Sequence, residues 1–142
     1  MRRRAALVAA GLAVLAGCAS SRLDPSLDAA WLLGIWECGP GHSRFEFTRA
    51  GDAITWTMHR PARFLSSNPK WGEKATAEVS GTVMKLSATS VELAGTYVHS
   101  DNPYLVGRRM RVWLTREGDR LLKGEMIGAG NEPVPALLRK IE

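Results

Sequence analysis

From about residue 30 onward, the chain is dominated by apolar and polar residues that alternate with a period of two. Phe45 and Phe47 alternate with polar neighbours, and Trp56 and Met58 repeat the pattern on the next segment. This period places successive side chains on opposite faces of a strand, whereas an amphipathic helix would repeat about every 3.6 residues. The pattern therefore predicts an all-β domain of half-buried strands. We expect strands at 33–38, 43–49, 53–60, 74–80, 82–88, 90–99, 108–116, 120–127 and 133–140.

Glycine-containing reversals separate these strands. Thr48–Asp52 and Thr115–Asp119 have nearly the same sequence, and the glycine of each can take a positive φ at a bulged hairpin. Ser80-Gly81 is interpreted as a further reversal, which divides 74–80 from 82–88. Sequential hairpins favour a single antiparallel up-and-down β-barrel of about 8 strands over a sandwich, because closure removes exposed strand edges.

The N-terminal segment has a different character. Arg2–Arg4 precede an uncharged apolar stretch, Ala5–Ala16, which is shorter than the roughly 20 residues of a membrane-spanning helix. The stretch ends in Leu15-Ala16-Gly17-Cys18, which resembles the lipobox of bacterial lipoproteins. That resemblance implies cleavage before Cys18 and a lipid anchor, including fatty acyl groups such as palmitate, on this residue.

The lipobox divides the chain into a signal peptide (1–17), a lipidated N-terminus with a flexible tether (18–29) and a β-barrel domain (30–142). Asp28–Leu33 has the composition of one helical turn that closes an end of the domain. Ala19, rather than aspartate, follows the lipidated cysteine. The sorting rule for lipoproteins of enteric bacteria then predicts anchoring in the outer membrane through Cys18, with the domain on the periplasmic face.

Charge argues against nucleic acid as a partner. The full chain has a net charge of +5, but the signal peptide holds three of its 19 basic residues. Removing it leaves 16 basic against 14 acidic residues, a formal +2. The remaining cluster, Arg108, Arg109 and Arg111, is interpreted as the solvated side of a strand.

Once Cys18 is lipidated, Cys38 is the one remaining cysteine, so the mature domain cannot form an internal disulfide. A lone thiol is most often buried. The alternatives are pairing with another molecule, or reactivity with the neighbouring His42 as a base.

Gly34-Ile35-Trp36 resembles the Gly-x-Trp signature of lipocalins and other calycin barrels. In those families the tryptophan packs across the closed end of the barrel beneath a ligand cavity, and a late arginine stacks on it. The resemblance implies a lipocalin-like fold with Arg139 as the partner of Trp36.

A second resemblance is to periplasmic lipoprotein inhibitors of c-type lysozyme. It rests on Trp36-Glu37-Cys38, Gly41 and the alternating strand that follows. Those proteins insert a Ser-Gly-x-x-Tyr loop into the enzyme cleft, to which Ala94-Gly95-Thr96-Tyr97 is a partial match.

Catalytic and cofactor motifs are missing from the sequence: it has no nucleophile elbow, phosphate-binding loop, dinucleotide fingerprint or metal-ligand spacing. We therefore expect that the protein is not an enzyme and has no cofactor or metal. An enzyme is the least favoured of three functions.

The most favoured function is a barrel that binds a small apolar or lipid-like ligand, unless large side chains fill it completely. Its predicted lining is Trp36, Phe45, Trp56, Met58, Tyr97 and Met110.

The second function is a protein–protein module, either a hydrolase inhibitor or an accessory subunit of an envelope complex. It would act through the irregular segments 61–72 and 100–107. Aromatic side chains there would anchor the partner. The predicted contact residues are Phe64, Trp71 and Tyr104.

Overall fold

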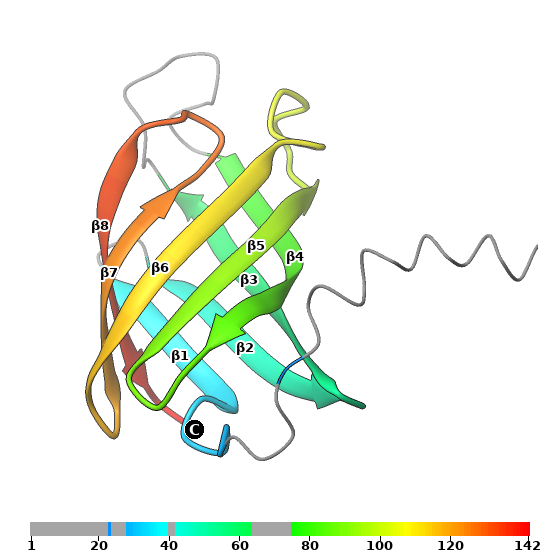
Figure 1. Ribbon diagram of the computed structural model, residues 1–142. Helices are drawn as coiled ribbons and strands as arrows, with labels where there is room; N and C mark the ends of the chain where they lie inside the picture. Colours follow the sequence, from blue (N-terminus) through cyan, green and yellow to red (C-terminus); the bar gives the residue numbers. More distant parts are fainter. Residues whose placement is uncertain (1–22, 24–27, 40–41, 64–74) are drawn as a thin grey trace, which may run out of the picture.

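The computed structural model describes residues 23, 28–39, 42–63 and 75–142. The strands form one closed barrel in which each pairs antiparallel with its neighbours in sequence, and β8 returns to β1 (Figure 1). This confirms the predicted all-β, up-and-down barrel. Its strands are β1 (Gly34–Gly39), β2 (Ser43–Ala50), β3 (Ala53–Arg63), β4 (Ala75–Leu86), β5 (Ser90–His99), β6 (Arg109–Gly118), β7 (Leu121–Ile127) and β8 (Pro133–Lys140). Among the described residues, no helix is long and apolar enough to cross a membrane.

The predicted reversal at Ser80-Gly81 is wrong, because both residues lie inside the continuous strand β4. Gly81 pairs with Trp56 of β3 on one side and with Gly95 of β5 on the other. A Cβ at Gly81 would collide with the backbone carbonyl oxygen of Ala94. Glycine is needed here because two strands approach each other closely. A glycine within a strand pattern can mark such a close approach as well as a turn or bulge.

The two similar hairpin sequences have different structures. Gly51 has a φ of 65°, as predicted, in a two-residue loop closed by the Ala50–Ala53 pair. In the second copy the loop lies further along the chain, and Gly118 is still paired, with Leu121. Gly118 has no positive φ, and the register shift lies between Arg116 and Gly118. The bulge is therefore within the strand rather than at the turn.

Aromatic side chains pack part of the interior of the barrel. Trp36, Phe45, Phe47 and Trp56 are each at most 2% exposed and belong to one apolar core. The ring centres of Phe45 and Trp56 are 5.6 Å apart, and those of Phe45 and Phe47 are 6.5 Å apart. A barrel of this strand number is just wide enough for side chains to fill its interior. This stretch of the interior is accordingly packed.

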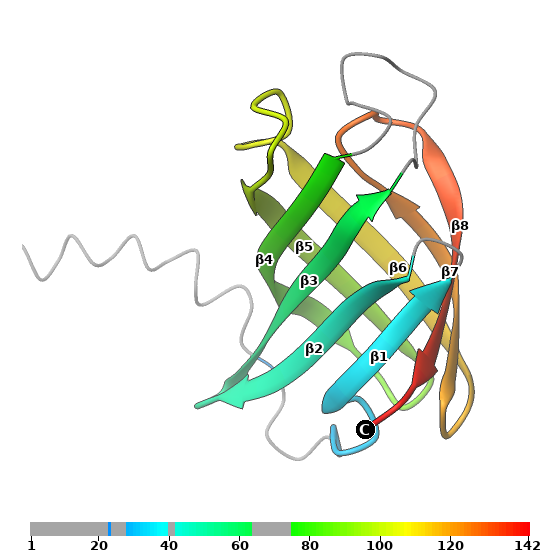
Figure 2. The ribbon, with the colours of Figure 1, turned by 180° about the vertical axis from the view of Figure 1, so that it is seen from behind.

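A turn preceding β1 closes one end of the barrel (Figures 1 and 2). The amide of Leu32 donates to the carbonyl oxygen of Ala29 at 2.9 Å, and the Leu32 side chain is fully buried. The indole Nε1 of Trp36 donates to the Leu32 carbonyl oxygen at 2.8 Å. The turn expected near the start of the domain is present, and it forms the closed end.

The cation that covers Trp36 is Lys140, so the prediction of Arg139 is wrong by one residue. Lys140 is opposite Trp36 in the β1–β8 register, whereas Arg139 is opposite Glu37 and is exposed. Lys140 Nζ lies 5.6 Å from the Trp36 ring centre. Because alternate residues of a strand face opposite sides, only Lys140 shares the inward face with Trp36.

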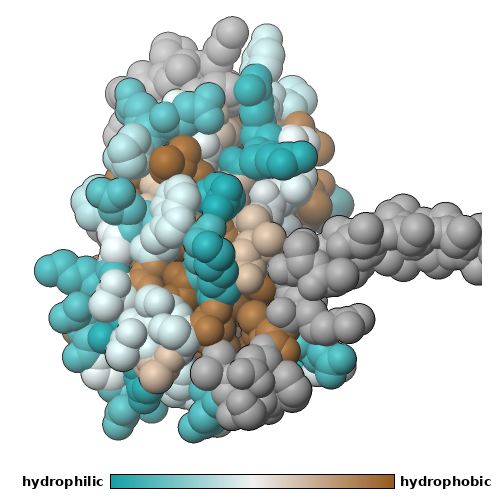
Figure 3. All heavy atoms as spheres, in the orientation of Figure 1, coloured by the Kyte–Doolittle hydropathy of each residue, from teal (hydrophilic) through white to brown (hydrophobic). Residues whose placement is uncertain are grey.

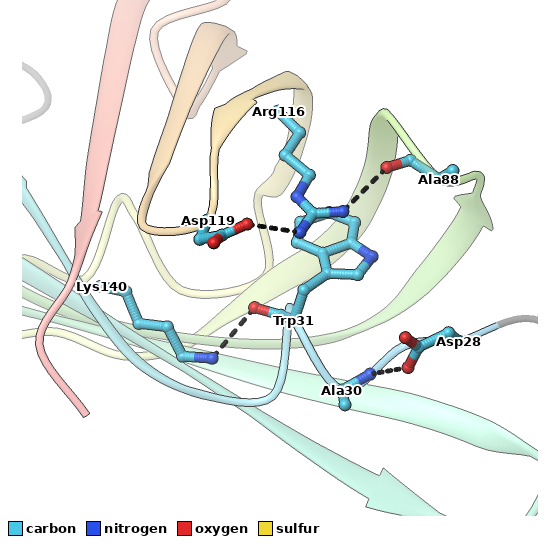
Figure 4. Close-up of polar contacts among 7 residues, drawn as sticks. All are labelled: Asp28, Ala30, Trp31, Ala88, Arg116, Asp119 and Lys140. Carbon is cyan, nitrogen blue, oxygen red and sulfur yellow. Dashed lines mark hydrogen bonds and ion pairs between the residues drawn. The ribbon is translucent and has the colours of Figure 1, made fainter.

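Arg116 of β6 covers the second tryptophan of the closed end (Figure 4). Its guanidinium carbon lies 4.7 Å from the centre of the Trp31 ring. The guanidinium donates to the carbonyl oxygen of Ala88 at 3.3 Å and to Asp119 Oδ1 at 3.1 Å. Cation–aromatic contacts and hydrogen bonds thus hold the turn against the β4–β5 and β6–β7 hairpins.

Candidate ligand site at the open end of the barrel

Inward-facing side chains become partly exposed at the end of the barrel opposite the turn. Val134 shares its face of β8 with the buried Ala136 and Leu138, yet it is 42% exposed. Its register partner on β7, Met126, is half-buried. Since these residues face the interior, solvent reaches the interior at this end, which we call the open end.

Arg60 adds a positive charge to the open end. It continues the inward row of β3 after Trp56 and Met58, and it is opposite Ala77, which is fully buried. Its side chain is half-buried. Burial lowers the pKa of Arg60 from its ordinary value, and the nearby Tyr97 and Asp101 act in the opposite direction. Arg60 remains cationic, because an arginine pKa is far above neutral.

Tyr97 of β5 brings a hydroxyl group to the same region. The side chain is only 4% exposed, and its oxygen accepts a hydrogen bond from the Ala129 amide at 3.3 Å. A Cβ at Gly128 would lie 2.6 Å from this oxygen, so glycine makes room for it. Burial raises the pKa of Tyr97, partly offset by the Ala129 hydrogen bond and by Arg60. The phenol is thus protonated at neutral pH and can donate its own proton.

The six predicted lining residues all lie in the one buried core. Tyr97 and Met110 lie toward the open ends of their strands, Met58 lies in the middle of β3, and Trp36 lies at the closed end. A Cβ at Gly95 would lie 2.7 Å from Cζ2 of Trp56, so the indole packs directly on the β5 backbone. The interior at the level of Trp56 is therefore filled by side chains.

Arg60 is absent from the predicted lining, although the strand pattern contained the signal for it. Arg60 stands two residues after Met58 in a segment predicted to be a strand through residue 60. Extending the alternation by one step would have placed its side chain inside the barrel. Because arginine is usually exposed, its position on the apolar row was not recognised.

The structure describes only some of the predicted partner-binding residues. Phe64 and Trp71 lie outside the described residues. Tyr104 is 56% exposed, and Val106 beside it is 49% exposed. The buried Leu105 between them anchors the β5–β6 loop to the core.

Hydrogen bonds to β4 fix the start of this loop. Ser100 Oγ donates to the carbonyl oxygen of Thr76 at 2.7 Å. The Thr76 amide donates to Asp101 Oδ1 at 3.0 Å, and the Asp101 amide donates to Thr76 Oγ1 at 3.2 Å. The loop therefore holds its exposed side chains in a defined place.

The outer face of β5 and β6 has a mixed polar and apolar surface (Figure 3). Arg111 forms an ion pair with Glu92, and its guanidinium lies 5.2 Å from the Trp113 ring centre. Arg109 is exposed on the same face of β6. The prediction that this arginine cluster lies on the solvated side of a strand is confirmed for Arg109 and Arg111.

Cys38 is buried, as predicted. Its Sγ lies 3.6 Å from the Gly39 carbonyl oxygen, and burial raises its pKa. The exposed His42 instead has Nδ1 3.9 Å from Glu37 Oε2, on the outer surface. A raised pKa disfavours the thiolate, which is the nucleophilic form. In the part of the chain that the structure describes, no group of three or more His, Cys, Asp or Glu residues could hold a metal ion.

No model of a known protein family, no curated protein and no solved structure matches this chain. The segment Ala94–Tyr97, compared above with the loop of lysozyme inhibitors, lies within β5 and ends in the buried Tyr97. These residues therefore form part of a strand and not an exposed loop of the kind that enters an enzyme cleft. The structure itself shows a closed barrel of eight antiparallel strands.

Proposed function

We propose that this chain is a membrane-anchored lipoprotein whose barrel binds a small apolar or lipid-like ligand at its open end. The observation that carries this proposal is the change in exposure of the inward-facing side chains from one end of the barrel to the other. Inward side chains are fully buried at the closed end, such as Leu32 and Trp36, but Val134 and Arg60 are partly exposed at the open end. A ligand would enter at the open end, since the turn before β1 covers the other.

The side chains around this region suit an apolar ligand of variable shape. Met110 and Met126 face inward near the open ends of β6 and β7, and Met58 faces inward from the middle of β3. Methionine is flexible and polarizable, so it adapts to irregular apolar surfaces. Ala77 and Ala136, also inward, occupy little volume. Ligand pockets are commonly lined this way, with a few polar groups that set orientation.

The N-terminal sequence supports the anchoring part of the proposal. Cys18 would carry the lipid, and Ala19 after it favours the outer membrane, with the barrel on the periplasmic face. The residues after the anchor up to β1 would tether the barrel near the bilayer. A carrier of apolar molecules would there lie close to a source of ligand.

Ligand binding can be tested by blocking the open end. Met126 and Ile127 are neighbours on β7 that face opposite sides of the barrel. Native mass spectrometry of the full chain purified from cell envelopes should show a bound small molecule. Met126→Trp should lose it, because indole would fill the region, while Ile127→Trp on the outer face should keep it. A wild-type protein that neither carries a ligand nor binds 1-octanol would refute the proposal.

The exposed loop supports a second candidate, a protein–protein module. Tyr104 and Val106 are held in solvent by an ordered loop, and Arg108 and Arg109 follow. Interface anchors are often tyrosine and arginine. A photo-crosslinking residue at position 104 should then capture one partner in intact cells, whereas the same residue at position 134 should not. Absence of a specific adduct at 104 would exclude this surface as an interface.

A further inference from the structure

We propose that the ligand is an amphiphile with an anionic head group, and that Arg60 and Tyr97 bind this head group at the open end of the barrel. The inference rests on the proposed function, because it names the chemical class of the ligand that the open end would hold. A carboxylate and a phosphate monoester share the necessary chemistry, namely negative charge on oxygen atoms that accept hydrogen bonds.

Arg60 is a cation on an otherwise apolar row. The inward residues before it on β3, Ile54, Trp56 and Met58, are all buried and apolar. Ala77, its register partner on β4, is also buried and apolar. Burying part of a guanidinium costs free energy that an apolar residue would not cost. A charged residue retained in such a place is a candidate for binding rather than for core packing.

The chemistry of arginine suits an anionic head group. The guanidinium has five N–H donors in a planar fork, which can bind two oxygens of one carboxylate or phosphate. Arg60 can therefore bind a head group with some of its N–H donors and use the others to keep the interactions that it already makes. In a partly buried region such charge-assisted hydrogen bonds are stronger than in water.

Tyr97 supplies a second donor beside Arg60. Its hydroxyl oxygen already accepts the Ala129 amide hydrogen at 3.3 Å, so its own proton can be donated to a ligand oxygen. Tyr97 is opposite Val79 of β4, two residues from Ala77, which is the register partner of Arg60, so both side chains lie beside the same part of β4. Together they would hold the head group while the alkyl chain packs on the inward methionines.

Asp101 is the carboxylate that acts on Arg60, and it would oppose a bound anion. Its side chain is exposed, and its Oδ1 accepts the Thr76 amide at 3.0 Å. Water and salt screen an exposed charge strongly, so its repulsion is weak. The half-buried Arg60 is screened less, and the balance favours binding of an anion.

The test compares four probes that share one alkyl chain: octanoate, octyl phosphate, 1-octanol and octylammonium. Binding to the full chain is measured by titration calorimetry at fixed ionic strength. We expect the wild-type protein to bind one or both anions at least ~10-fold tighter than 1-octanol, and octylammonium most weakly. Of octanoate and octyl phosphate, the one that binds more tightly identifies the class of the head group.

Two variants and one control locate the effect. Arg60→Met should reduce the preference for anions over 1-octanol to within ~2-fold while leaving 1-octanol affinity unchanged. Tyr97→Phe should lower anion affinity by about 3- to 10-fold and leave 1-octanol affinity within ~2-fold. Arg109→Met, which removes an exposed arginine from the outer face of β6, should keep the full preference.

The outcomes separate the two proposals. Equal wild-type affinity for octanoate, octyl phosphate and 1-octanol overturns the head-group site but leaves the proposed carrier function intact. Binding of none of the four probes by a protein that also carries no co-purified ligand overturns both. An undiminished anion preference in Arg60→Met also overturns the site. If that variant does not fold, Arg60→Lys replaces it: a selectivity loss is expected because lysine lacks the planar fork, and undiminished selectivity argues against the site.

Discussion

Lys140 joins the last strand to the first through the face of Trp36. Its Nζ lies 5.6 Å from the Trp36 ring centre and donates to the Trp31 carbonyl oxygen at 3.0 Å. The contact connects β8, β1 and the turn that closes the barrel. Lys140 is therefore expected to stabilise the closed end rather than to take part in binding.

Replacing Lys140 with methionine should lower the free energy of unfolding by about 1 kcal/mol, because a cation–aromatic contact and a hydrogen bond are lost. Arg139→Met is the matched control, since Arg139 is exposed on the opposite face of β8, and its effect should stay within about 0.5 kcal/mol. Urea unfolding followed by tryptophan fluorescence measures both. Equal losses in the two variants would show that the Trp36 contact contributes nothing specific.

Gly95→Ala should destabilise the barrel, because a Cβ there would lie 2.7 Å from Trp56 Cζ2 and 2.9 Å from the Ser80 carbonyl oxygen. Overpacking of this kind costs about 1–3 kcal/mol. Gly118→Ala is the control, because nothing lies within 4 Å of its added Cβ and its φ is not positive. Thermal unfolding of the two variants compares them; a Gly95 variant as stable as wild type would mean that the indole can move away freely.

Stability should fall at alkaline pH, partly because of Cys38. Burial raises its folded-state pKa, so its contribution is complete below the unfolded value of about 8.5 and is lost as pH rises through the folded value. Tyr97 acts in the same direction at higher pH. Cys38→Ala should reduce the loss of urea stability between about pH 7 and pH 10, whatever its effect at neutral pH. An unchanged alkaline loss in this variant would assign the effect to other groups.

The proposed lipid anchor on Cys18 predicts a specific processing phenotype. Globomycin, which blocks lipoprotein signal peptidase, should cause the precursor to accumulate, and the mature N-terminus should be a modified Cys18. Cys18→Ser should release the protein from the membrane fraction, while Ser20→Ala, two residues further on, should not. Mass spectrometry of the N-terminal peptide decides the question, because an unmodified mature N-terminus contradicts lipidation.

Alternation was sufficient to predict most of the strands, because the side-chain period of a strand is a local property. Phe45, Phe47, Trp56 and Met58 are buried as their spacing indicates. Local patterning failed at Gly81, where the glycine serves a neighbouring strand rather than a turn. The Gly-x-Trp resemblance likewise implied Arg139 instead of Lys140, because the correct choice depends on the register of β8 with β1.

The candidate site shows the same division. Tyr97, Met58 and Met110 were predicted to line the interior, and all three are buried in the one core. Arg60 was not included, because a single charged residue at the end of a strand pattern is usually solvated. The register of β3 with β4 places Arg60 opposite the buried Ala77, which the local pattern alone does not indicate.

By itself, the amino-acid sequence determined the all-β class, the spacing of most hairpins and which face of each strand is apolar, because these follow from neighbours a few residues apart. The tertiary structure decided which residues from distant strands meet: Lys140 with Trp36 at the closed end, and Arg60 near Tyr97 at the open end. These pairings depend on strand register around a closed barrel, where a shift of one residue turns every side chain to the other face.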